Sequence, residues 1–161
     1  MVRWSPTATF EGENITVIKE GEVPANDMSV SATFTIPEAK YGANYIQFVR
    51  VNRDDPVNVQ FNIKPSMTIS PGTVTPGENI TITGHGFAAE DSGTITFDGE
   101  ETDLTFTPDE LGTFTVEYSV PDLPSGDHKF EADSPKLYTE TSTAVMEIVP
   151  VSYTHLTLPT N

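Results

Sequence analysis

The chain of 161 residues contains 13 prolines, 11 glycines and no cysteine, and its 24 acidic and 8 basic side chains give a formal net charge of -16. Without cysteine the chain has no disulfide framework, no thiolate metal site and no cysteine nucleophile. The negative charge repels phosphate backbones and anionic headgroups, so we expect no nucleic-acid partner. No apolar run approaches the roughly 20 residues of a membrane-spanning helix. We therefore expect no membrane insertion in this fragment, and the start MVRWSPTATF also lacks the apolar core of a signal peptide.

The first predicted elements in chain order are short strands with one apolar face. Apolar and polar residues alternate in two stretches, 30–36 and 59–63, and prolines and glycines separate such stretches along the chain. A period of two predicts β-strands. The side chains expected to face a core in residues 1–64 are Phe10, Val30, Ala32, Phe34, Ile36, Val59, Phe61 and Ile63.

Residues 65–150 continue the alternation over a larger set of strands. The inward positions are expected to be Ile80, Ile82, Ile95, Phe97, Phe114, Val116, Tyr118, Val120, Ala144, Met146 and Ile148. Clusters of Gly, Pro, Asp and Ser lie between the strands, as in SPGTVTPGEN, FDGEET and VPDLPSGDH. Six or seven short strands with half-buried faces predict an all-β fold, an antiparallel β-sandwich.

Short motifs recur at a nearly constant offset of 84 to 87 residues, which indicates a tandem repeat of about 85 residues. The matching pairs are Phe10-Glu11-Gly12 with Phe97-Asp98-Gly99, Phe34-Thr35-Ile36-Pro37 with Tyr118-Ser119-Val120-Pro121, Gly42 with Gly126, and Pro65 with Pro150. Applied to residues 66–87, which supply two opening strands of the second copy, the offset gives positions before Met1. We therefore expect a truncated copy over 1–64, a complete copy over 65–150, and a longer parent protein in which Met1 is internal.

The stretch SPGTVTPGENITITGHGFAAEDSGTITFDG resembles the opening of the immunoglobulin-like TIG/IPT and related bacterial and archaeal surface-repeat domains. GTFTVEYSVPDLPSGDHKFEA is similar to their later half, so the resemblance covers residues 65–150. It implies tandem immunoglobulin-like β-sandwiches, the first incomplete, in an extracellular or cell-surface protein. The matching positions are structural: Pro76-Gly77 forms a turn, and Gly84 and Gly86 let the chain fold over while Phe87 enters the core.

The candidate chemical groups form neither a catalytic nor a metal-binding pattern. His85 in a turn, His128 after a turn, and His155 lack the i, i+2 or i, i+4 spacing of a ligand pair. No serine lies in a G-x-S-x-G elbow or an S-x-x-K arrangement, and the chain has no P-loop or G-x-G-x-x-G fingerprint. We therefore expect a protein that is not an enzyme and needs no cofactor.

Two sets of residues remain as candidate sites. The acidic hairpin DGEETD offers Asp98, Glu100 and Asp103 as Ca²⁺ ligands, but it lacks the D-x-D-x-D-G order of a calcium loop, and a solvated turn is the favoured interpretation. The triplets that start at Asn14 and Asn79 are acceptor sequons for glycosylation.

The last eleven residues, VSYTHLTLPTN, interrupt the repeat. The second copy has its closing strand by Pro150, just as the first copy ends at Pro65, and a further copy would begin with a stretch like SMTISP. Residues 151–160 instead resemble one translated reading frame of a transposase sequencing-library adapter. We interpret residues 151–161 as a non-native tail and leave them out of functional reasoning, against the alternative that SYTHLTL is a genuine strand.

Three classes of function differ in how well they fit these patterns. The favoured class is a structural spacer of an extracellular or cell-surface array, whose partners are neighbouring immunoglobulin-like repeats of the same chain. The alternative is an adhesin or carbohydrate-binding module with glycans or surface proteins as partners, which requires exposed aromatic side chains. The candidates are Trp4 at a truncated edge, Tyr41 in a turn, Tyr45 and Tyr138. An enzyme fragment, the third class, is disfavoured because the catalytic groups are missing.

Overall fold

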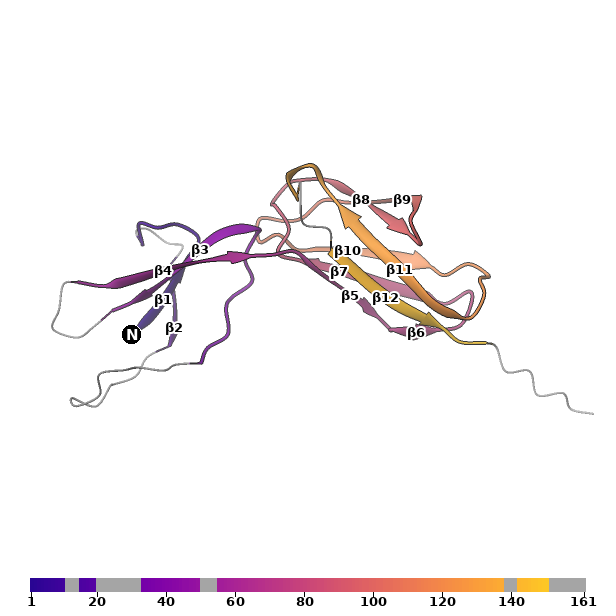
Figure 1. Ribbon diagram of the computed structural model, residues 1–161, viewed down its shortest axis with the longest axis horizontal. Helices are drawn as coiled ribbons and strands as arrows, with labels where there is room; N and C mark the ends of the chain where they lie inside the picture. Colours follow the sequence, from indigo (N-terminus) through magenta and orange to yellow (C-terminus); the bar gives the residue numbers. More distant parts are fainter. Residues whose placement is uncertain (11–14, 20–32, 50–54, 138–141, 151–161) are drawn as a thin grey trace, which may run out of the picture.

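The computed structural model describes residues 1–10, 15–19, 33–49, 55–137 and 142–150. These residues form β-strands and one short 3-10 helix, η1 at Pro135–Leu137, so the predicted all-β class is confirmed. An N-terminal unit of β1 to β4 and a C-terminal unit of β5 to β12 follow one another along the long axis (Figure 1). Nothing helical in this part of the chain has the length and apolarity needed to span a bilayer.

Several positions singled out in the sequence lie outside the described residues. They are Asn14, Val30, Ala32, Tyr138 and the tail 151–161, which includes His155.

The N-terminal unit contributes one antiparallel sheet in the order β2-β1-β3-β4. Its strands are β1 at Val2–Ser5, β2 at Thr16–Lys19, β3 at Gly42–Phe48 and β4 at Val57–Ile63. Because β1 lies between β2 and β3, the prediction that Trp4 lies at an edge is wrong; the side chain is buried in a central strand.

The predicted core positions of the N-terminal unit differ in burial. Phe10 is buried, whereas Val59 on β4 is 46% exposed. No second sheet lies against this unit within the described residues, which leaves part of the apolar face of β4 uncovered. The half-buried positions are Phe34, Ile36, Phe61 and Ile63.

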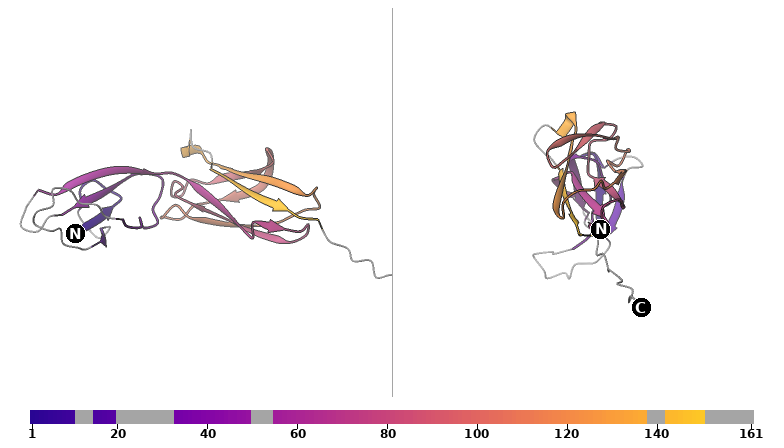
Figure 2. Two further views of the ribbon diagram at one scale, coloured as in Figure 1. Left: turned by 60° about the horizontal axis from the view of Figure 1, so that its bottom comes forward. Right: turned by 90° about the vertical axis from the view of Figure 1, so that its right-hand side faces the viewer.

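The C-terminal unit is a sandwich of two sheets, ordered β10-β7-β5 and β6-β12-β11-β8-β9 (Figure 2). Every pairing is antiparallel except that of β6 with β12. The strands are β5 at Ser66–Ser70, β6 at Thr73–Val74, β7 at Asn79–His85, β8 at Gly93–Phe97, β9 at Glu100–Phe106, β10 at Phe114–Ser119, β11 at Gly126–Asp133 and β12 at Ser142–Ile148.

The core of the C-terminal unit follows the predicted alternation. Ile82, Ile95 and Met146 are fully buried between the sheets. On β10, Phe114 is buried while its neighbour Thr115 is exposed. This alternation removes one apolar face of each strand from water, which is the main force that stabilises such a sandwich.

Three phenylalanine rings fill the end of this core nearest the N-terminal unit. Phe87 meets Phe106 and Phe114 edge to face, with ring centroids 5.3 and 4.9 Å apart. Gly84 makes room for them, because a Cβ atom there would lie 2.1 Å from the ring of Phe114. The predicted entry of Phe87 into the core is thus confirmed, at 0% exposure.

The two units share one sheet architecture. The order β2-β1-β3-β4 is matched by β9-β8-β11-β12 in the larger sheet of the C-terminal unit. Gly42 of β3 faces Ile63 of β4, and Gly126 of β11 faces Ile148 of β12, so the offsets are 84 and 85 residues. Both glycines have positive φ angles, 105° and 140°, which favour glycine.

One motif match of the predicted repeat is wrong. Trp4 faces Ile46 in the N-terminal unit, and Phe97 faces Phe130 in the C-terminal unit. Because Ile46 and Phe130 are 84 residues apart, Phe97 corresponds to Trp4 and not to Phe10. Phe10 therefore occupies a different place in the fold from Phe97.

Candidate functional site

The clearest candidate site is the junction between the two units. β4 ends at Ile63 and β5 begins at Ser66, so only Lys64 and Pro65 connect them. Proline fixes its own φ angle and restricts the preceding residue to extended conformations, which stiffens so short a link. In Figure 1, β4 leads almost directly into β5.

The loop that precedes β3, residues 36–41, contacts the C-terminal unit. The N–H of Tyr41 donates a hydrogen bond to the carbonyl oxygen of Phe87 at 2.9 Å. The N–H of Phe87 in turn donates to the carbonyl oxygen of Gly112 at 3.0 Å. The side chain of Tyr41 packs against the core of the C-terminal unit, and Ala39 is only 7% exposed. A main-chain hydrogen bond and apolar contact thus hold this loop against the C-terminal unit.

Two glycines of the C-terminal unit let the two backbones approach each other. At Gly86, where φ is 71°, an added Cβ atom would lie 2.6 Å from the carbonyl oxygen of Lys64. At Gly112, where φ is 78°, it would lie 2.8 Å from Cα of Lys40. An added side chain at Gly86 therefore collides with the main chain of the link, and one at Gly112 collides with both units, since it would also lie 2.3 Å from the carbonyl oxygen of Phe87.

One ion pair crosses the junction. Nδ1 of His85, the last residue of β7, lies 3.3 Å from a carboxylate oxygen of Glu38, and this contact is an ion pair only when the imidazole is protonated. Both side chains are well exposed, and such pairs contribute less than about 1 kcal/mol because water screens them. The pair therefore adds little to the stability of the junction. His85 was predicted in a turn that starts at Gly84, but β7 extends through both Gly84 and His85.

A cleft of about 190 Å³ remains at the junction, lined by Pro37, Glu38, Ile63, His85 and Thr113 among others. Binding clefts for small molecules usually measure roughly 300–1,000 Å³. The cleft is therefore small for a substrate and is better described as the seam between two docked units.

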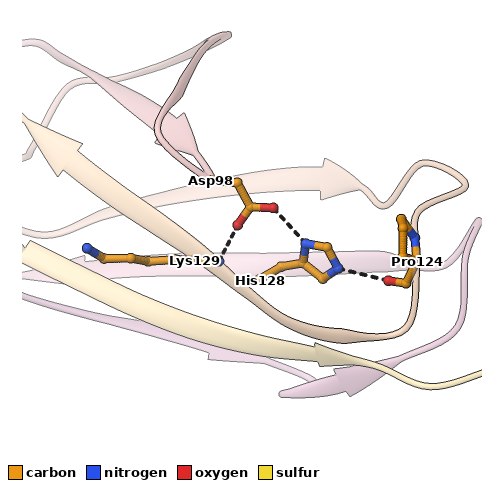
Figure 3. A network of polar contacts seen from close by, with 4 residues as sticks. All are labelled: Asp98, Pro124, His128 and Lys129. Atoms are coloured by element: carbon orange, nitrogen blue, oxygen red, sulfur yellow. Dashed lines mark hydrogen bonds and ion pairs between the residues drawn. The ribbon is translucent and has the colours of Figure 1, made fainter.

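A second polar site ties the β8–β9 turn to β11 (Figure 3). The carboxylate of Asp98 accepts hydrogen bonds from the N–H of Lys129 at 2.8 Å and from Nδ1 of His128 at 2.7 Å. Nε2 of His128 lies 2.9 Å from the carbonyl oxygen of Pro124. Asp98 and Gly99 both have positive φ, 51° and 84°, as a two-residue type I′ hairpin requires.

These contacts shift the titration of both groups. The hydrogen bond from the Lys129 main chain, and then that from His128, lower the pKa of the Asp98 carboxyl. The hydrogen bond to Asp98, and then that to the Pro124 carbonyl, raise the pKa of His128. Phe97 stacks on the imidazole with centroids 5.5 Å apart. Because both acceptors face ring nitrogens, the site favours the imidazolium form.

The chemistry available at this second site is limited. Both ring nitrogens of His128 and both oxygens of Asp98 are directed at groups of the chain itself. No hydroxyl or thiol nucleophile takes part in the contacts. The network acts as a clamp on the hairpin, and nothing in the spacing of Asp98 and His128 along the sequence indicated it.

The candidate Ca²⁺ ligands are not gathered into one site. Asp98 is engaged by His128, and Glu100 and Asp103 lie three positions apart on β9, which directs them to opposite faces of the strand. Within the described residues, no group of three or more His, Asp or Glu side chains could hold a metal ion. The sequon residue Asn79 is exposed at the first position of β7.

The aromatic candidates for ligand binding are largely covered. Trp4 is buried, Tyr41 is docked at the junction, and Tyr45 is half-buried. No aromatic side chain in the described part of the chain is exposed. Within the junction loop, the sequence did not single out Glu38, Ala39 and Lys40, although the Ile36-Pro37 motif that matches Val120-Pro121 lies directly before them.

The C-terminal unit is similar to a known protein family. Residues 65–144 match the model of a protein family described as the IPT/TIG domain, within the region where the resemblance was predicted. No curated protein matches the sequence.

Three solved structures illustrate the similarities found. A Dscam structure concerned with isoform specificity has 17% identity and a TM-score of 0.34, and the alignment covers 91% of this chain and 37% of that one. Murine CEACAM1b has 15% identity and a TM-score of 0.36, with 92% and 85% covered. SGBP-B of a Bacteroides ovatus mixed-linkage glucan utilization locus, solved with a heptasaccharide, has 16% identity and a TM-score of 0.38, with 71% and 32% covered. The chain thus spans little more than a third of the Dscam structure's length.

Proposed function

We propose that this chain, whose residues 65–144 carry an IPT/TIG domain, is a non-catalytic structural spacer that holds adjacent immunoglobulin-like units in a fixed orientation in an extracellular or cell-surface protein. The observation that carries the proposal is the junction. A link of two residues, a main-chain hydrogen bond from Tyr41 to Phe87 and two closely approached glycines join the units. A spacer needs such a junction because a flexible linker would let the two units reorient relative to each other.

The polar networks support a structural role. The His128 network closes on the chain's own groups, and the Glu38–His85 pair lies on the seam between units. The negative charge of -16 keeps a surface-exposed module soluble and favours separation of neighbouring molecules. Immunoglobulin-like units of this family are typical of extracellular or surface proteins, which supports the proposed location.

Amide relaxation by NMR on the whole chain tests the spacer function. We expect one rotational correlation time for both units, because a docked pair tumbles as one body. A version with a flexible Gly-Ser insertion between Lys64 and Pro65 should give two shorter correlation times. Independent tumbling of the two units in the unaltered chain would contradict the proposed function.

A glycan array with the whole chain tests the alternative of a carbohydrate-binding module. We expect no saturable binding, since no exposed aromatic platform occurs in the described residues. Binding to one glycan class that competes with free sugar would favour the alternative instead.

A further inference from the structure

The end of the C-terminal unit that lies away from the N-terminal unit repeats the geometry of the junction. We call it the far end and define it by the loop 120–125 and residues 148–150. The offsets of 84 and 85 residues found for the sheet register relate this loop to the junction loop 36–41, and Ile148 to Ile63. Figures 1 and 2 place the loop before β11 and the end of β12 together there.

The two ends also carry corresponding clefts. The junction cleft is lined by Glu38 and Ile63 from the N-terminal unit. The far-end cleft, of about 270 Å³, is lined by their counterparts Asp122 and Ile148. A carboxylate beside an apolar strand end is thus present at both places, although only the first has a unit docked on it.

The corresponding side chains differ in exposure as expected for a covered and an uncovered copy of one surface. Ala39 is buried at the junction, whereas its counterpart Leu123 is half-buried. Tyr41 is half-buried, whereas its counterpart Ser125 is exposed. The far end therefore leaves Leu123 half-buried and Ser125 exposed at positions whose counterparts at the junction are more covered.

We infer that the far end is a docking surface for a further immunoglobulin-like unit, an inference that rests on the proposed spacer function. The incoming unit must offer a carbonyl oxygen to the N–H of Ser125, as Phe87 does to Tyr41, and a glycine at the close approach, as Gly86 does. A cationic or protonated group opposite Asp122 completes the match.

The apolar contact expected at the far end differs from the one seen at the junction. Ser125 cannot supply the apolar contact that Tyr41 makes with the neighbouring core. Leu123, larger than Ala39 at the corresponding place, supplies apolar surface instead. The docking unit should therefore bring an apolar side chain toward Leu123.

The test joins a second copy of residues 66–150 directly to Pro150, in place of 151–161, so that Ile148-Val149-Pro150 replaces Ile63-Lys64-Pro65 as the link. We expect the amide signals of Asp122, Leu123 and Ser125 to shift, and the added copy to share the correlation time of the whole chain. The solvent exchange rate of the Ser125 amide should also fall, because it gains an acceptor.

A matched pair of variants in the added copy separates docking from mere attachment. Gly86→Asn in that copy keeps a residue that tolerates positive φ but adds a side chain at the close approach, so it should release the added unit. Gly99→Asn, also at positive φ, meets nothing within 4 Å and should leave it docked.

Two outcomes are distinguishable. If the original junction tumbles as one body while the added copy tumbles freely and the signals of residues 122–125 do not move, the inference is overturned and the spacer function stands. If the original junction is itself flexible, the proposed function fails, and the inference fails with it.

Discussion

Nδ1 of His128 lies 2.7 Å from a carboxylate oxygen of Asp98, and this contact joins the β8–β9 turn to β11 across 30 residues of sequence. The raised pKa of His128 means that its stabilising effect is complete below the pKa of an unfolded histidine, about 6.5, and is lost as the pH rises through the folded value. The lowered pKa of Asp98 means that its effect is present above about 3.9 and is lost as the pH falls through the folded value.

The pair is therefore expected to stabilise the fold most between about pH 4 and pH 6.5. Asp98→Asn should lower the pKa of His128, because the hydrogen bond that the imidazolium donates to residue 98 is weakened. Imidazole shifts followed by NMR titration measure it. Asp103→Asn on the same hairpin is the control and should leave the titration of His128 unchanged. An equal shift in both variants would show that general charge, not the contact, sets the pKa.

Side chains along β10 alternate between the buried and the exposed face, so neighbouring substitutions should differ in their effect on stability. Phe114→Ala should lower the free energy of unfolding by about 3–5 kcal/mol, because the ring is buried against Phe87 and Phe106 and its removal leaves a cavity. Thr115→Ala, one position along on the exposed face, should change it by no more than about 0.5 kcal/mol. Denaturant titration of both variants gives the comparison, and similar losses would contradict the strand orientation.

The junction prediction concerns Gly86 of the unaltered chain. Gly86→Asn should separate the units, because a Cβ atom meets the Lys64 carbonyl oxygen and the Ile63 side chain. The melting temperature of the C-terminal sandwich should stay nearly unchanged, whereas the correlation time of the N-terminal unit should fall. Gly99→Asn is the control at an open positive-φ position. Unchanged relaxation in the Gly86 variant would show that the units are not in close contact in solution.

The thermal stability of the chain should depend on ionic strength. With a net charge of -16, repulsion is strongest when screening is weak, so the melting temperature should rise as the Debye length falls from about 30 Å at 0.01 M to about 3 Å at 1 M salt. Calorimetry over this range measures the change. Micromolar Ca²⁺ at low salt serves as the second arm: if it alone reproduces the rise, the hairpin of Asp98, Glu100 and Asp103 binds the ion.

The domain prediction concerns the two parts in isolation. Residues 65–150 should fold alone, since the buried core cluster lies entirely between Met67 and Ile148. Residues 1–64 should not, since one sheet with an exposed Val57 and Val59 buries too little apolar surface to offset chain entropy. Thermal melts of each part decide it. A cooperative melt of residues 1–64 alone would count against the prediction.

The sequence by itself determined the strands of the C-terminal unit. The period-two alternation that includes Ile80, Ile82, Phe114 and Met146 depends only on the geometry of an extended chain, in which neighbouring side chains point to opposite faces. Turn residues act locally as well, so the hairpin at Asp98 and Gly99 could be expected from two adjacent letters. The fold class followed from these local signals.

Only the tertiary structure decided which distant residues meet. Trp4, and not Phe10, corresponds to Phe97. Cross-strand register depends on the lengths of the loops between strands, and the matching of sequence motifs at a nearly constant offset cannot detect a difference in one loop. The contacts of Glu38 with His85 and of Asp98 with His128 likewise depend on strand order and on how two units dock. Such contacts have no sequence period, since they are fixed by packing in three dimensions and not by the spacing of residues along the chain.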